Sequence, residues 1–199
     1  MKTHHKFALI ILAVIILVVA GWYLIWKKEG WAGATLPGAS LAGQLGGKVF
    51  DGASSPFGQS AGTYADSDLG FSFQYPYNWT VESSGLSSAR LVTVVLPAKN
   101  QSFQVYVTPI DDPSITAITV AEIRHDLPNL DIRDPQDFSV GKNSAGKGVS
   151  FLSSLSGVKG DVRQIWFAAD HEFFQFTAPV LSDDVLSAVL KTFTIGRRS

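Results

Sequence analysis

Apolar and polar residues alternate along much of the chain, and this alternation predicts β-strands. Phe71, Phe73 and Tyr75 alternate with polar positions, as expected for a half-buried strand. The further predicted strands are Leu91–Leu96, Phe103–Val107, Phe138–Val140, Val149–Leu155, Val162–Ala168 and Phe173–Thr177. Short polar segments at 98–101 and 169–172 predict hairpin turns between neighbouring strands.

Two segments have helical periodicity instead. Thr119 followed by Glu122 matches a capping box, which predicts a helix that ends before Pro128. Ser182 can cap a second helix, whose apolar stripe consists of Val185, Leu186, Val189, Leu190 and Phe193. Strands grouped in hairpins, with one helix in mid-chain and one at the end, predict an α+β fold in which helices flank an antiparallel sheet.

The N-terminal part of the chain has a different pattern. Phe7–Trp26 contains twenty residues without a charge and would form a helix about 30 Å long, which is the thickness of a bilayer core. The residues at its end are typical of a membrane interface, with aromatic and then basic side chains: Trp22, Tyr23, Trp26, Lys27 and Lys28. We therefore predict a transmembrane signal anchor at 7–26 after a short basic N-terminus, 1–6. Cleavage after Ala20 is the alternative.

Residues 27–63 separate this anchor from the rest of the chain. Nine of the 18 glycines lie in this range, which predicts a flexible linker followed by a globular domain at 64–199. The first 63 residues hold five basic and two acidic residues, while the domain has an acidic excess. With the N-terminal amine adding positive charge before the span, we expect a cytoplasmic N-terminus and an extracytoplasmic C-terminal domain in a single-pass cell-membrane protein.

The composition excludes several classes of site. The 199-residue chain has no cysteine, so it has no disulfide, thiol nucleophile or zinc–thiolate centre. Its net charge of −1 argues against nucleic acid as a partner. No motif indicates a cofactor.

One resemblance adds to this pattern. In Gly70–Trp79 an aromatic strand leads into Tyr75-Pro76 and then Trp79, which resembles the opening of PsbP/Mog1-type domains. Gln164–Phe167 and Phe173–Pro179, followed by the capped helix, are similar to the end of those domains. The resemblance implies an α/β/α sandwich and a function in binding partners rather than catalysis. Tyr75, Pro76 and Trp79 are expected to close the end of the sheet and pack against the core.

Candidate chemistry is sparse in the domain. His125 and His171 each follow or precede an acidic neighbour, but residues adjacent in sequence do not form a catalytic dyad. Asp131, Asp134 and Asp137 could offer oxygen ligands to calcium, although they lack the glycine and glutamate of an EF-hand loop. The stretch 141–148 approaches a phosphate-binding loop but ends in glycine and precedes a strand pattern, which indicates a hairpin loop.

We therefore expect a membrane-anchored, extracytoplasmic, non-catalytic binding or assembly module with a protein partner near the membrane surface. The alternative is a protein that holds a lipid or small envelope ligand between sheet and helix. A hydrolase that uses His125 or His171 is the third hypothesis.

Overall fold

The computed structural model describes residues 49–50, 57, 61–86, 89–96, 101–141, 145–155 and 160–196. The predicted anchor Phe7–Trp26, its interface residues at 22–28 and the possible cleavage site at Ala20 lie outside this part of the chain. Within the described residues, no helix has the length and apolar character needed to cross a membrane.

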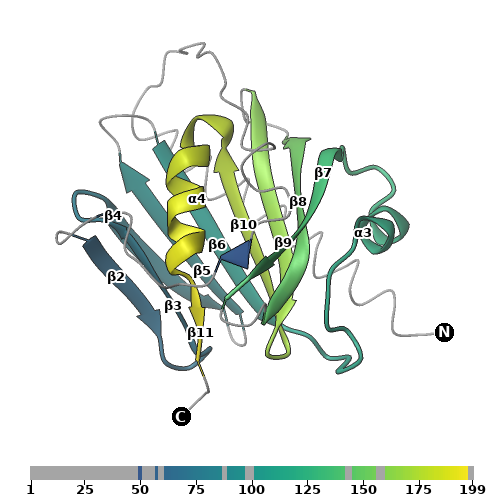
Figure 1. The fold of residues 1–199 in the computed structure, drawn as a ribbon, viewed down its shortest axis with the longest axis horizontal. Coiled ribbons are helices and arrows are strands. Elements are labelled where there is room, and N and C mark those ends of the chain that lie inside the picture. The colour runs from purple at the N-terminus through teal and green to yellow at the C-terminus, as the bar shows by residue number, and fades with distance from the viewer. Residues whose placement is uncertain are drawn as a thin grey trace.

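Strands account for 58% of the described residues. Figure 1 shows the elements, which are, in chain order, β1 (Val49–Phe50), β2 (Ala61–Asp66), β3 (Phe71–Pro76), β4 (Thr80–Leu86), β5 (Ala89–Leu96), β6 (Gln101–Pro109), α3 (Val120–Asp126), β7 (Arg133–Val140), β8 (Gly146–Ser154), β9 (Asp161–Ala169), β10 (Glu172–Pro179), the 3₁₀ helix η4 (Val180–Ser182), α4 (Asp183–Thr192) and β11 (Thr194–Ile195).

The strands form two sheets. The larger sheet has eight strands in the order β1-β7-β8-β9-β10-β6-β5-β4, and the smaller sheet has the order β11-β3-β2. Neighbouring strands are antiparallel except for β1, which runs parallel to β7. Helix α4 crosses one face of the larger sheet, and α3 lies beside β7 (Figure 1).

The predicted α+β fold, a helix-flanked α/β/α sandwich, is wrong for this chain. One face of the larger sheet is covered by the smaller sheet together with α4, which has only ten residues. The other face is partly covered by the seven-residue α3 and the segments beside it. Phe71 and Phe73 of β3 cover this face with buried apolar side chains, where the prediction expected helices to cover it. The described part of the chain is therefore mostly β, with two largely antiparallel sheets packed on each other.

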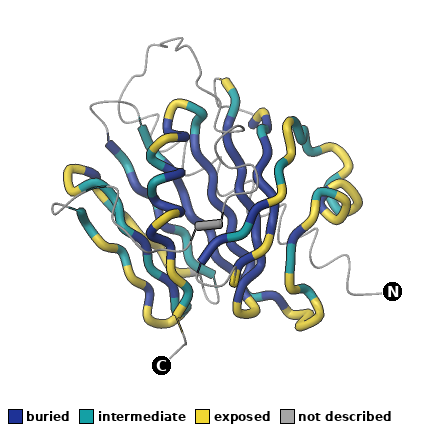
Figure 2. Tube along the Cα trace, viewed as in Figure 1, coloured by how far each residue is buried: buried dark blue, intermediate teal, exposed yellow. Residues whose placement is uncertain are grey.

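The main core lies between the larger sheet and the layer formed by the smaller sheet and α4. The rings of Phe167 and Phe174 stack with centroids 4.9 Å apart, and Phe193 meets them edge-on at 5.6 and 5.4 Å. The predicted apolar stripe of α4 faces this core, with Val185 partly buried and Leu186, Val189, Leu190 and Phe193 fully buried. Figure 2 shows burial concentrated in the central strands.

Local sequence signals account for several boundaries. The Thr119 hydroxyl accepts a hydrogen bond from the Glu122 backbone, and the Glu122 carboxylate accepts one from the Thr119 N–H, so the predicted capping box of α3 is confirmed. Asp170 and His171 both have positive φ angles, of 48° and 63°, as a two-residue hairpin turn requires. Ser182 precedes α4, but its side chain does not cap the helix as predicted. Its Oγ accepts a hydrogen bond from the Ser102 N–H at 3.1 Å.

Part of the range predicted as linker contributes to the fold. Val49 and Phe50 pair with Ser139 and Val140 of β7. Phe57 packs against the main core. Strand β2 begins at residue 61, three residues before the predicted start of the domain.

Candidate functional site

Polar side chains occupy the centre of the larger sheet on the face that points away from α4. We call this the amide face and the opposite, aromatic one the helix face. Gln104, Gln164, Gln175 and Thr177 lie on the amide face, and we call them the amide cluster. Each is at most 2% exposed. Their neighbours in the strands, such as Phe176, point into the core of the helix face, as the alternation of a strand requires.

The strand register brings the cluster together. Thr177 of β10 pairs with Gln104 of β6 on one side and with Gln164 of β9 on the other. Gln164 Oε1 is a shared acceptor: Thr177 Oγ1 donates to it at 2.9 Å, Trp166 Nε1 at 3.0 Å and Gln175 Nε2 at 3.1 Å. We call the groups that share Gln164 Oε1 the closed part of the cluster; Gln175 Oε1 takes no part in it.

Two side-chain oxygens of the cluster accept no hydrogen bond from any residue that the structure describes. They are Gln104 Oε1 and Gln175 Oε1. The Gln104 amide group makes only one long contact, from Nε2 to Thr93 Oγ1 at 3.4 Å. A buried acceptor without a donor costs about 1–3 kcal/mol of stability. These two oxygens are therefore candidate contact points for a hydrogen-bond donor from another molecule.

The amide face becomes more exposed from β6 toward the edge strand β4. Gln104 on β6 is buried, Thr93 beside it on β5 is half-buried, and Glu82 beside Thr93 on β4 is exposed. Burial raises the pKa of the Tyr106 phenol on the same face, so this group stays uncharged at neutral pH. The described positions of this surface are Thr80, Glu82, Ser84, Ala89, Leu91, Thr93, Val95, Ser102, Gln104, Tyr106 and Thr108, of which Glu82 alone is charged.

The rest of the amide face is closed by the chain around α3. Ile110, Ile118 and Ile123 form a buried cluster with apolar side chains of β8, β9 and β10, namely Val149, Phe151, Trp166, Ala168 and Phe173. A partner that docks on β4 and β5 would therefore lie next to Gln104 at the edge of the buried cluster.

The three aspartates predicted as calcium ligands do not form a metal site. Asp131 Oδ2 accepts hydrogen bonds from Arg133 Nε and from Ser154 Oγ, both at 3.0 Å. Asp134 and Asp137 lie exposed on β7, and Asp134 has a φ of 47°. In the described part of the chain, no three His, Asp or Glu side chains are grouped so that they could hold a metal ion.

Arg133 is instead the centre of an ion-pair network. Its Nη1 and Nη2 donate to the two carboxylate oxygens of Asp161 at 3.0 and 2.8 Å, and Nη2 also donates to Ser154 Oγ at 3.1 Å. The hydrogen bond from Arg133 lowers the pKa of Asp161. The network joins residues of β7, β8 and β9 and uses all three nitrogens of the guanidinium group.

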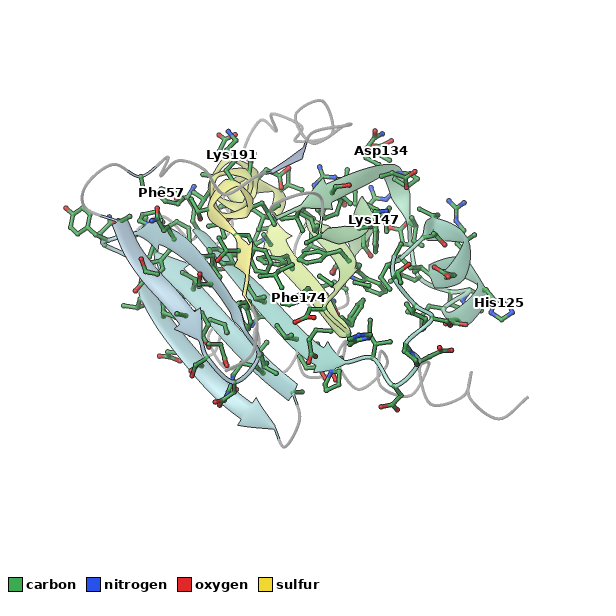
Figure 3. All side chains as sticks on the ribbon, turned by 60° about the horizontal axis from the view of Figure 1, so that its bottom comes forward. Phe57, His125, Asp134, Lys147, Phe174 and Lys191 are labelled. Carbon is green, nitrogen blue, oxygen red and sulfur yellow. The ribbon has the colours of Figure 1, made fainter. Side chains whose placement is uncertain are left out.

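Both histidines of the domain lie on exposed segments. His125 is at the end of α3, where its Nδ1 is 2.9 Å from Asp126 Oδ1 and its side chain is 77% exposed. Figure 3 shows His125 pointing away from the sheets. His171 is in the exposed turn between β9 and β10. Neither histidine lies in a buried site.

The remaining predicted motifs contribute to packing. Trp79 is buried with its ring 6.2 Å from that of Phe103, and its backbone N–H donates to the Pro76 carbonyl at 3.0 Å. Tyr75 packs half-buried against the main core. Gly148, at the end of the stretch resembling a phosphate-binding loop, lies within β8. A Cβ there would collide with the Trp166 carbonyl, so close strand packing explains this glycine.

The space between the larger sheet and α4 is occupied by side chains. Phe176 and Phe193 have ring centroids 5.6 Å apart and continue the packing of Phe167 and Phe174. In Figure 3, Phe174 lies in this interior. This region gives no support to a lipid held between sheet and helix.

Sequence reasoning missed the amide cluster. The segments that contain Gln164, Gln175 and Thr177 were assigned to packing because their aromatic residues dominate the pattern. The signal was present: Gln164 and Trp166, like Gln175 and Thr177, are two residues apart and so share one face of a strand.

Comparisons with known proteins assign no family. No family model matches the sequence, and no curated protein matches it. A crystal structure of a protein from Bacteroides thetaiotaomicron VPI-5482, determined at 1.50 Å resolution, is similar with a TM-score of 0.40 and 11% sequence identity. The match covers 70% of this chain and 50% of the other, so the chain spans about half the length of that protein. A likeness this distant carries no argument about function.

Proposed function

We propose that the protein is a non-catalytic binding or assembly module that is held outside the cytoplasm by a membrane anchor at Phe7–Trp26. The observation that carries the proposal is the pair of buried acceptors, Gln104 Oε1 and Gln175 Oε1, which no group in the described part of the chain satisfies. A donor from a partner would remove the cost of leaving them unsatisfied.

The chemistry of the amide face favours recognition over catalysis. A glutamine amide is neither a nucleophile nor a general base, but it fixes the orientation of a hydrogen-bonded partner. Leu91 and Val95 add half-buried apolar area next to Thr93. A largely uncharged face with apolar area and acceptors fits the surface of a protein partner that presents hydrogen-bond donors.

Two sequence features support the same class. The stretch Gly70–Trp79 resembles PsbP/Mog1-type domains, and most of those domains act by binding partners. The uncharged segment Phe7–Trp26 and the glycine-rich residues after it would hold the domain near a membrane surface. We therefore place the partner in the same membrane or close to it.

The first test is crosslinking in cells with the full-length chain, compared with a chain that lacks residues 64–199. We expect a partner that is captured saturably only when the domain is present. The purified partner and the full chain are then used to measure a dissociation constant. Absence of any domain-dependent partner, with the domain folded and exported, would overturn the proposal.

The second test asks whether the amide face makes the contact. Gln104→Met removes the acceptor with little change in volume and should weaken binding about 5–10-fold, as expected for one lost hydrogen bond. Gln74→Met is the matched control, because Gln74 Oε1 on β3 also lacks a donor but lies in the smaller sheet. Equal effects of the two substitutions would contradict the assignment of the amide face.

A further inference from the structure

Another unsatisfied polar group, Arg163, lies on the helix face, on the opposite side of the sheet from the amide cluster. Arg163 of β9 pairs with Ala178 of β10 and Leu152 of β8. Its side chain is fully buried. Its position on β9 is close to the start of the strand, where Asp161 is half-buried and Gly160 is exposed. The guanidinium group is therefore buried near one end of the sheet.

Most of the donors of this guanidinium group are unused. Nη2 donates to Asp183 Oδ2 at 3.3 Å, which is long for a charge-assisted hydrogen bond. Nε and Nη1 have no hydrogen-bond partner among the described residues. An arginine cannot lose its charge inside a protein, so it cannot reduce the cost of burial as a lysine or a carboxylate would. The acceptors for Arg163 Nε and Nη1 must therefore come from another molecule.

Arg133 shows what a satisfied arginine looks like in the same molecule. All three of its nitrogens donate to Asp131, Asp161 or Ser154, and its side chain is 42% exposed. Arg163 has the greater need for partners because water does not reach it, yet it has one long contact. The difference points to a missing ligand at Arg163.

The surroundings of Arg163 define the ligand. Asp183 is the first residue of the ten-residue helix α4, so the guanidinium group lies next to a helix N-terminus, which carries partial positive charge. Nε and Nη1 are both donors, so the ligand must offer acceptors and carry negative charge. Asp183 already offsets the formal charge of Arg163, so binding depends on directed hydrogen bonds, and we expect millimolar affinity.

We propose that Arg163 anchors a site for a small oxyanion, a carboxylate or a phosphate group, beside the N-terminus of α4. The oxyanion accepts a hydrogen bond from Arg163 Nε, while Asp183 accepts one from Nη2. This site is independent of the amide face.

The test is thermal unfolding of the full-length chain at constant ionic strength in chloride, formate or phosphate. At ten times the dissociation constant, the bound anion should raise the unfolding midpoint by about 3 °C relative to chloride. A rise in formate alone identifies a carboxylate site, and a rise in phosphate alone identifies a phosphate site. No rise in either anion overturns the proposal.

Two conservative variants separate the site from a general salt effect. Arg163→Lys keeps a positive charge opposite Asp183 but removes Nε and Nη1, so the anion-dependent rise should disappear. Arg133→Lys makes the same change at the satisfied arginine and should keep the rise. Equal rises in both variants would show a general effect of the anion on stability and would overturn the proposal.

A direct measurement applies if Arg163→Lys does not fold. Nitrogen-15 NMR of the arginine Nε–H groups in the unmodified chain should show a saturable shift of the Arg163 signal with formate or phosphate. The Arg133 signal should stay in place because its Nε already donates to Asp131. A static Arg163 signal would contradict the site.

Discussion

The two faces of the eight-stranded sheet differ in their side chains, which are largely aromatic on the helix face and largely polar at the centre of the amide face. On the helix face, the rings of Phe167, Phe174 and Phe193 pack at centroid distances of 4.9 to 5.6 Å. On the amide face, the same strands carry Gln164 and Gln175, and two buried glutamine oxygens of that face have no donor in the part of the chain that the structure describes. The helix face contributes stability through packing, whereas part of the amide face retains groups that reduce stability. Groups retained at a cost of this kind are candidates for function.

The largest effect is expected on the helix face. Phe174→Ala removes a ring that contacts Phe71, Phe167 and Phe193. We expect the free energy of unfolding to fall by about 3–5 kcal/mol, because the cavity cannot collapse between packed rings. Denaturant unfolding of the full-length chain measures this change. His125→Ala, at an exposed site, should change it by less than about 0.5 kcal/mol; a loss at Phe174 as small as that would refute the role given to the ring cluster.

A smaller effect is expected for the closed part of the amide cluster. Gln164→Met removes the acceptor shared by Thr177 Oγ1, Trp166 Nε1 and Gln175 Nε2. Buried donors are then left without a partner, and we expect a loss of about 1–3 kcal/mol in the free energy of unfolding. The same denaturant measurement applies. Unchanged stability would mean that the network does not hold in solution.

The open part of the cluster should respond in the opposite direction. Gln104→Met removes an acceptor that has no donor and breaks only the 3.4 Å contact with Thr93. We expect the free energy of unfolding to rise or stay within about 1 kcal/mol of the original value. Paired unfolding curves for the Gln104 and Gln164 variants check the difference in sign. A loss at Gln104 equal to that at Gln164 would remove the distinction between the open and closed parts.

The smallest effect is expected in the satisfied network around Arg133. Asp161 has a lowered pKa in the folded protein because Arg133 donates hydrogen bonds to it. Its contribution to stability is therefore present above the unfolded-state pKa of about 3.9 and is lost as the pH falls through the lower folded-state pKa. Asp161→Asn should make the loss of stability below about pH 4 less steep. Unfolding midpoints measured from pH 6 to pH 2.5 test this, and an identical pH profile would contradict it.

The hairpins could be predicted from sequence because local chemistry specifies them. Alternation located the strands around Phe103, Ile165 and Phe174, and the two residues with positive φ lie where a turn between β9 and β10 was expected. Strand β4 was not predicted, because its serine-rich sequence has little apolar alternation and it lies at the edge of the sheet. The second sheet was not predicted because one of its strands, β2, lies partly in the range predicted as linker.

The amino-acid sequence by itself determined the periodicity of the strands, the capping box of α3, the apolar stripe of α4 and the absence of thiol chemistry. These depend on neighbours within a few residues or on composition. Only the tertiary structure decided that a second sheet shares the core with α4, that three glutamines from three strands meet on one face, and that Arg163 is buried with unused donors. These features depend on strand register and on which layer covers which face, and contacts between residues distant in sequence set both.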